Sequence, residues 1–84
     1  MYEVYLERAA ERDLIRLPER IRLDILTAIK RLGDNPRPPG CLKLSGSVND
    51  WRIRMREYRV LYEIDDGHKA VRVMHVRHRR EAYR

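Results

Sequence analysis

Residues 51–64 read WRIRMREYRVLYEI, and this stretch decides the fold. In its first half, apolar and basic residues alternate, so a strand would carry its arginines, Arg52, Arg54 and Arg56, on one face. Its second half alternates again, with Arg59 pointing away from the apolar side chains of Tyr58, Val60, Tyr62 and Ile64. The stretch therefore predicts a β-hairpin with one apolar face and one arginine face. Like charges repel across a sheet, so an anion such as a polyphosphate is expected over the arginine face.

The charge of the chain is concentrated in the same region. The 84 residues carry a formal charge of +6, with a pI near 10.0. Residues 1–34 hold seven basic and seven acidic residues, whereas residues 35–84 hold twelve basic and six acidic residues. The whole excess lies where the strands are predicted, and a localised basic patch is typical of nucleic-acid-binding proteins.

The remaining pattern predicts one small α+β domain over residues 1–84. Residues 2–6 suggest an opening strand, and helical spacing of apolar residues predicts helices over 9–17 and 19–32, separated at Pro18. Residues 42–44 are a short strand candidate, Asp65-Asp66-Gly67-His68 signals a turn, and residues 70–76 form a β-branched strand before a basic tail, 77–84. The expected order is β-α-α-β-β-β, with a helical hairpin packed on one face of a small antiparallel sheet.

Composition also bears on where the protein works. Cys41 is the only cysteine, so no disulfide forms within the chain, which suits a reducing compartment. No apolar run approaches the roughly 20 residues of a membrane span, and the N-terminus lacks the pattern of a signal peptide. A cytoplasmic protein that does not contact the membrane is expected.

Four motifs along the chain together carry a family resemblance. The chain resembles the RelE/ParE superfamily of bacterial and archaeal toxins, and most closely a RelE-type mRNA interferase. The motifs are Leu14-x-x-Leu17-Pro18; Leu42-Lys43-Leu44-x-Gly46; Trp51-Arg52-Ile53-Arg54 followed by residues 58–65; and His78-Arg79-Arg80-Glu81-x-Tyr83-Arg84.

The resemblance implies a toxin of a type II toxin–antitoxin system with the RelE fold. Such a toxin is a ribosome-dependent endoribonuclease that cuts mRNA in the A site and thereby inhibits translation. The 2′-hydroxyl attacks the adjacent phosphate, without a metal or other cofactor. The implied partners are mRNA, the ribosome and a cognate antitoxin protein.

The resemblance also implies roles for single residues. Arg52 and Arg54 stand where the family has basic residues facing RNA, and Arg59 where an arginine clamps the scissile phosphate. Arg79 matches an arginine near the leaving oxygen, and Tyr83 a tyrosine that stacks on a base. The other basic residues of the patch, Lys43, Arg56, Arg77 and Arg80, are expected to bind RNA.

Proton transfer is the open step, because arginine has a pKa above about 12 and is a poor base. His78 is the first candidate, since histidine titrates near neutral pH. Glu57 and His75 are alternatives, although alternation places His75 on the face of Val71 and Val73, where a packed strand residue is expected.

Two other functions fit the same sequence. A ParE-like toxin would share the fold and inhibit DNA gyrase, without needing the basic catalytic cluster. A catalytically inactive RNA-binding relative would keep the arginines for binding alone.

Overall fold

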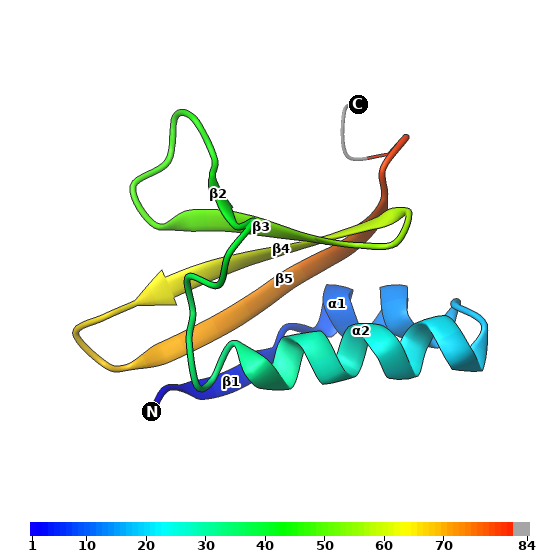
Figure 1. The fold of residues 1–84 in the computed structure, drawn as a ribbon, viewed down its shortest axis with the longest axis horizontal. Helices are drawn as coiled ribbons and strands as arrows, with labels where there is room; N and C mark the ends of the chain where they lie inside the picture. Colours follow the sequence, from blue (N-terminus) through cyan, green and yellow to red (C-terminus); the bar gives the residue numbers. More distant parts are fainter. Residues whose placement is uncertain (82–84) are drawn as a thin grey trace.

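The computed structural model describes residues 1–81 as two helices and five strands (Figure 1). Tyr83, expected to stack on a base, lies outside these described residues. The elements follow the expected order, with the short strand candidate present as a strand of its own. They are β1 (Glu3–Leu6), α1 (Arg8–Ile15), α2 (Glu19–Arg31), β2 (Leu42–Lys43), β3 (Asp50–Met55), β4 (Tyr58–Asp65) and β5 (Ala70–His78).

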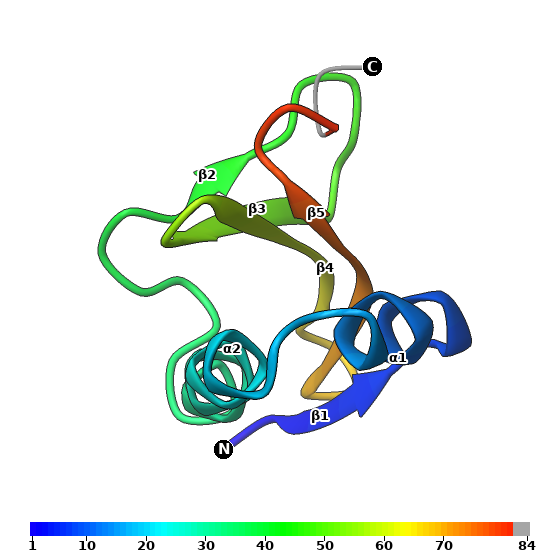
Figure 2. The same cartoon turned by 90° about the vertical axis from the view of Figure 1, so that its right-hand side faces the viewer.

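The two helices form because each has one apolar stripe and a proline separates them. Pro18 occupies the position just before α2, where its fixed φ is compatible with the start of a helix but not with continuation of α1. On α2 the buried stripe consists of Ile25, Ala28 and Ile29, at helical spacing. Both helices lie on the same side of the sheet (Figure 2), as the sequence predicts.

The sheet has the strand order β1-β5-β4-β3-β2. Strands β2, β3, β4 and β5 are paired antiparallel, but β1 runs parallel to β5, with Glu3 opposite Ala70 and Leu6 opposite Val73. The fold class is confirmed, with the refinement that the sheet is mixed rather than wholly antiparallel. Alternation shows that residues 2–6 form a strand, but it does not specify which strand becomes their neighbour.

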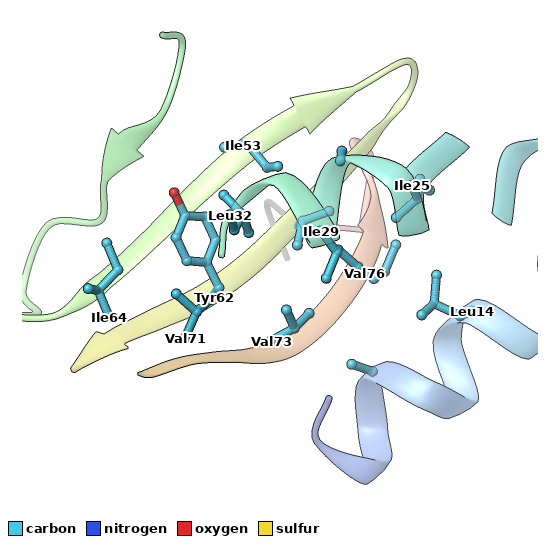
Figure 3. Close-up of a cluster of buried hydrophobic side chains, with 13 residues drawn as sticks. Leu14, Ile25, Ile29, Leu32, Ile53, Tyr62, Ile64, Val71, Val73 and Val76 are labelled. Atoms are coloured by element: carbon cyan, nitrogen blue, oxygen red, sulfur yellow. The ribbon is translucent and has the colours of Figure 1, made fainter. Parts of the chain in front are cut away.

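The core lies between the sheet and the helices (Figure 3). Apolar side chains of β3, β4 and β5 meet the stripe of α2 and one face of α1. Neither of the two helices within residues 1–81 covers the opposite face of the sheet, here called the open face. The largest fully buried side chain is that of Tyr62. The buried residues of this cluster are Ala10, Leu14, Ile25, Ala28, Ile29, Leu32, Ile53, Val60, Tyr62, Ile64, Val71, Val73 and Val76.

Both predicted turns form, but with unexpected residues in strained positions. Arg56 lies in the turn between β3 and β4 rather than on the arginine face, with a φ of 57° that residues other than glycine rarely adopt. Its guanidinium pairs with Asp24 of α2 at 2.6 Å, which ties the turn to the helix layer. In the turn between β4 and β5, the positive φ occurs at Lys69 and not at Gly67.

No helix within residues 1–81 is long and apolar enough to cross a membrane.

Candidate functional site: an arginine row on the open face

Three arginines stand side by side on the open face. The strand register places Arg54 of β3 opposite Arg59 of β4, and Arg59 opposite Arg77 of β5. Opposite residues on neighbouring strands have Cβ atoms about 5 Å apart, so the three side chains leave the sheet at neighbouring points of the same face. We call this set the arginine row. The hairpin pattern predicts the first two members, whereas the sequence places Arg77 in a tail beyond the last strand, which in fact extends to His78.

The arginine row is not uniformly exposed. Arg59 is only 6% exposed, Arg77 is half-buried and Arg54 is exposed. A guanidinium held at the centre of the sheet has little conformational freedom and is weakly hydrated, so it is organised in advance to bind a planar or tetrahedral anion. An anion over the row would also relieve the repulsion among the three charges.

A hollow of about 110 Å³ lies beside the arginine row. A water molecule occupies about 30 Å³ in the liquid, so the hollow has room for one phosphodiester group. We call it the arginine hollow; its lining residues are Arg54, Arg56, Tyr58, Arg59 and Arg79. The lining comes from β3, β4, the turn between them and the segment after β5, so residues distant in sequence create one cationic site.

Arg79 is held at this site by the β3–β4 turn. Its backbone N–H donates to the carbonyl oxygen of Glu57 at 2.7 Å, and its Nε lies 2.9 Å from the Glu57 carboxylate. Both side chains are more than half exposed, so the ion pair contributes little stability. Glu57 therefore orients Arg79, which remains free to exchange this partner for a phosphate.

His78 lies on the opposite face from the arginine row. It stands opposite Tyr58 in the register, and its ring meets that of Tyr58 edge to face at 5.3 Å. Its Nδ1 accepts a hydrogen bond from the backbone N–H of Arg80 at 3.3 Å. The structure does not bring His78 into the arginine hollow, so a proton-transfer role for it stays a prediction.

A β-bulge moves His75 to the open face. Leu61 is opposite His75 while Tyr62 is opposite Val73, so Met74 is an extra residue on β5. The expectation that His75 shares a face with Val71 and Val73 is therefore wrong. The sequence carries one signal of the bulge. The core residues Val71 and Val73 are two positions apart, whereas Val73 and Val76 are three positions apart.

The His75 side chain joins β5 to α1. An Arg77 guanidinium nitrogen lies 3.0 Å from His75 Nδ1, and since arginine only donates, Nδ1 accepts. The carboxylate of Asp13 lies 3.5 Å from the same nitrogen and accepts a hydrogen bond from the backbone N–H of Val76 at 2.9 Å. The sequence gives no signal that Asp13 contacts His75 and Val76, because these contacts depend on α1 lying against the edge of β5.

The other predicted binding residues are dispersed. Arg52 lies on the open face, one row from Arg54 and opposite Leu61. Lys43 stands opposite Trp51, which places it on the face that carries the core. Arg80 is exposed beyond the end of β5. Arg56 reaches the arginine hollow from the turn, although its ion pair with Asp24 holds it toward the helices.

Within residues 1–81, no group of three His, Cys, Asp or Glu side chains is placed to hold a metal ion.

Comparison with known proteins agrees with this architecture. Residues 4–83 match the family model described as the ParE toxin of type II toxin–antitoxin system, parDE. Toxin RelE of Mycobacterium tuberculosis is 36% identical over 84 residues, covering 99% of this chain and 87% of that protein.

Solved structures show the same fold. The toxin–antitoxin complex RelBE2 of M. tuberculosis contains a chain with a TM-score of 0.82 and 32% identity, covering 92% of this chain and 96% of that chain. The archaeal RelE–RelB complex of Pyrococcus horikoshii gives a TM-score of 0.83 at 24% identity, covering 93% and 94% of the two chains. The family match, the sequence identity and the shared fold agree, and the chain belongs to the RelE/ParE superfamily of toxins of type II toxin–antitoxin systems, in which it is RelE-like.

Proposed function

We propose that this toxin is a metal-independent endoribonuclease that cleaves mRNA in the ribosomal A site and so inhibits translation. The observation that carries the proposal is the arginine row, three arginines in register across β3, β4 and β5, with the arginine hollow beside it. A ParE-like toxin that inhibits DNA gyrase would share the fold without needing this cluster of like charges for catalysis.

In this proposal the scissile phosphate binds over Arg59. Attack by the neighbouring 2′-hydroxyl makes a five-coordinate phosphorane, whose equatorial oxygens gain negative charge. Arg59 is buried and has little room to move, so its donors would meet that charge with little reorganisation. Arg54 and Arg77 flank it, and Arg79 reaches the hollow from the segment after β5, where it can neutralise charge on the departing oxygen.

The lining of the arginine hollow also explains why the ribosome would be needed. Among residues 1–81 it consists of four arginines and one tyrosine, and arginine neither gives nor takes a proton at neutral pH. These residues therefore contribute charge stabilisation and positioning. A reaction promoted in this way depends strongly on in-line geometry of the attacking and leaving oxygens, and the ribosome supplies that geometry by holding the codon.

The proposal is tested with Arg54→Gln and Arg77→Gln on ribosomes programmed with a defined mRNA. Each substitution removes one positioned charge, and we expect cleavage to fall by about 10²- to 10³-fold. Primer extension measures the cut at codon resolution. The matched control is Arg31→Gln, an exposed arginine of α2 on the other side of the molecule, which should leave cleavage unchanged.

Three results would contradict the proposal. The first is full cleavage by the Arg54→Gln/Arg77→Gln double variant. The second is growth arrest with intact mRNA together with inhibition of DNA supercoiling by gyrase, which would instead assign the toxin to the gyrase-directed branch. The third is RNA binding without any cut, which would indicate an inactive RNA-binding relative.

We also propose that a cognate antitoxin neutralises this toxin. The M. tuberculosis relative of 32% identity was solved as a toxin–antitoxin complex, and the arginine row offers a cationic surface to an acidic segment that folds on binding. Co-expression with the adjoining open reading frame should raise the yield of soluble toxin and relieve growth arrest. A neighbouring product that neither binds nor protects would argue against this partner.

A further inference from the structure

A second cationic hollow lies where α1 meets β5. Its volume is about 260 Å³, and it is distinct from the arginine hollow, with which it shares no lining residue. We call it the helix hollow; its lining residues are Ala9, Arg12, Asp13, Arg16, His75 and Arg77. The helix hollow is therefore lined by three arginines and one histidine against one aspartate. It is locally cationic even though Arg12 and Arg16 belong to residues 1–34, whose net charge is zero.

Asp13 is the one carboxylate that residues 1–81 contribute to the helix hollow, and it is already engaged. Asp13 is 17% exposed at its side chain, accepts from the backbone N–H of Val76 and lies beside His75. Arg12 lies on α1, and Arg16 is the residue that caps the C-terminal end of α1, four positions later, in a helical backbone conformation; both are exposed. Neither forms an ion pair with any residue among 1–81, so their donors are available to a ligand.

The helix hollow adjoins the arginine row, because Arg77 belongs to both. Arg77 lines the helix hollow, and it stands opposite Arg59, which lines the arginine hollow. Strand β4, which supplies Arg59 to the arginine hollow, lies on one side of β5, and α1, which supplies Arg12 and Asp13 to the helix hollow, contacts β5 through Asp13 and Val76. A sugar–phosphate backbone that crosses the strands over Arg59 and Arg77 would reach both hollows.

We infer that the helix hollow binds a second phosphate of the RNA strand whose scissile phosphate occupies the arginine row. Arg12, Arg16 and Arg77 supply the donors, with Arg77 held in place by its hydrogen bond to His75. The inference rests on the proposed function for the identity of the strand. The helix hollow contributes affinity and register on the RNA, since a contact remote from the reacting phosphate is equally strong before and during reaction.

The test measures binding of a single-stranded RNA oligonucleotide of about 12 nucleotides, with 2′-methoxy groups that prevent cleavage, at several salt concentrations. Arg12→Gln/Arg16→Gln should weaken binding about tenfold and lower the slope of log K against log salt by about 0.7, the value for one lost phosphate contact on a single strand. The matched control, Arg20→Gln/Arg31→Gln, removes two exposed arginines from α2 and should change neither the slope nor the affinity beyond a small uniform loss.

The cleavage reaction gives an independent measure. On programmed ribosomes, Arg12→Gln/Arg16→Gln should raise KM and leave kcat near that of the unaltered toxin, whereas Arg54→Gln, which lies outside the helix hollow, should lower kcat. Circular dichroism confirms that each variant is folded, which is expected because the substituted side chains are exposed.

The outcomes separate this inference from the proposed function. An altered salt slope with no cleavage by the unaltered toxin would support the helix hollow and reject the activity. Normal cleavage with an unchanged slope and affinity in Arg12→Gln/Arg16→Gln would overturn the helix hollow alone. Weakened binding of the antitoxin with unchanged RNA binding would also overturn it, because it would assign these arginines to a protein partner.

Discussion

Tyr62 shows how one side chain connects the core to a loop that has no secondary structure of its own. Its ring is fully buried, and its hydroxyl donates to the carbonyl oxygen of Pro36 at 2.7 Å (Figure 3 shows the ring and hydroxyl). Burial raises the pKa of Tyr62, because the charged phenolate would lose its hydration there. The hydrogen bond fixes the proline-rich loop between α2 and β2 against the sheet.

Replacing Tyr62 with phenylalanine should reduce the free energy of unfolding by about 1 to 3 kcal/mol, because the Pro36 carbonyl is left buried without its donor. Chemical denaturation measures the change. Tyr5→Phe is the control, since its hydroxyl binds an exposed partner, Glu3, and its loss should have little effect. An equal loss in the two variants would mean that burial of the Tyr62 hydroxyl is not the cause.

The same burial predicts how stability depends on alkaline pH. The pKa of Tyr62 is raised in the folded state, so as pH rises above about 10 the unfolded chain releases this proton first. The contribution of Tyr62 is therefore complete below about pH 10 and declines as pH increases. Unfolding measured across this range should show a decline that is shallower in Tyr62→Phe, and an identical decline in both proteins would contradict the assignment.

At the scale of elements, the neighbours of β5 and its bulge determine where His75 and Arg77 lie. Strand β5 has β4 on one side and, on the other, β1 at its start and α1 at its end. The Met74 bulge lies between these two halves, so the start of β5 packs Val71 and Val73 into the core while its end turns His75 and Arg77 to the open face. Asp13 of α1 takes the place of a neighbouring strand by accepting the hydrogen bond of Val76.

Removing that acceptor should loosen the end of β5. We expect Asp13→Ala to lower the free energy of unfolding by about 1 to 3 kcal/mol, because the Val76 N–H loses its partner at a partly buried position. Hydrogen exchange of the Val76 amide should accelerate in Asp13→Ala. Asp13→Asn keeps a side-chain oxygen and should retain most of the protection, so equal exchange rates in both variants would show that the carboxylate has another role.

The elements also show what the sequence can and cannot predict. The β3–β4 hairpin was predictable because its alternation is local, and the arginine pair Arg54 and Arg59 followed from it. The bulge was missed because one extra residue leaves no change in residue type, only the altered spacing of Val73 and Val76. The role of Asp13 and the alignment of Arg77 with Arg59 depend on which strands become neighbours, and that is settled by packing of the whole chain rather than by any short pattern.

Over the whole molecule, Arg37 connects three separate regions. Its guanidinium lies 2.8 Å from the Asp66 carboxylate in the β4–β5 turn and 5.1 Å from the centre of the Trp51 ring on β3. Tyr2, just before β1, donates to the same carboxylate. The hydrogen bond from Arg37, followed by that from Tyr2, lowers the pKa of Asp66. The proline-rich loop, the sheet and the N-terminus are thus joined at one end of the molecule, away from the arginine row.

This connection should be visible on acidification. Because the pKa of Asp66 is depressed in the folded state, its contribution to stability is present above about pH 3.9, the value for an unperturbed aspartate, and is lost as pH falls further. Arg37→Ala should raise the pKa of Asp66 toward that value, as measured by NMR titration of the carboxyl carbon. Asp65 provides an internal control, since its lowered pKa depends first on the backbone N–H of His68 and should not change.

The parallel pairing of β1 with β5 has a consequence for how this toxin is made. Glu3 and its partner Ala70 are separated by most of the chain, so the first strand cannot find its place until the last one has been synthesised. Arg77 lies on that same last strand, so a nascent chain has neither a closed sheet nor a complete row of charges. The order of synthesis therefore delays the appearance of the cationic face until β5 has been made.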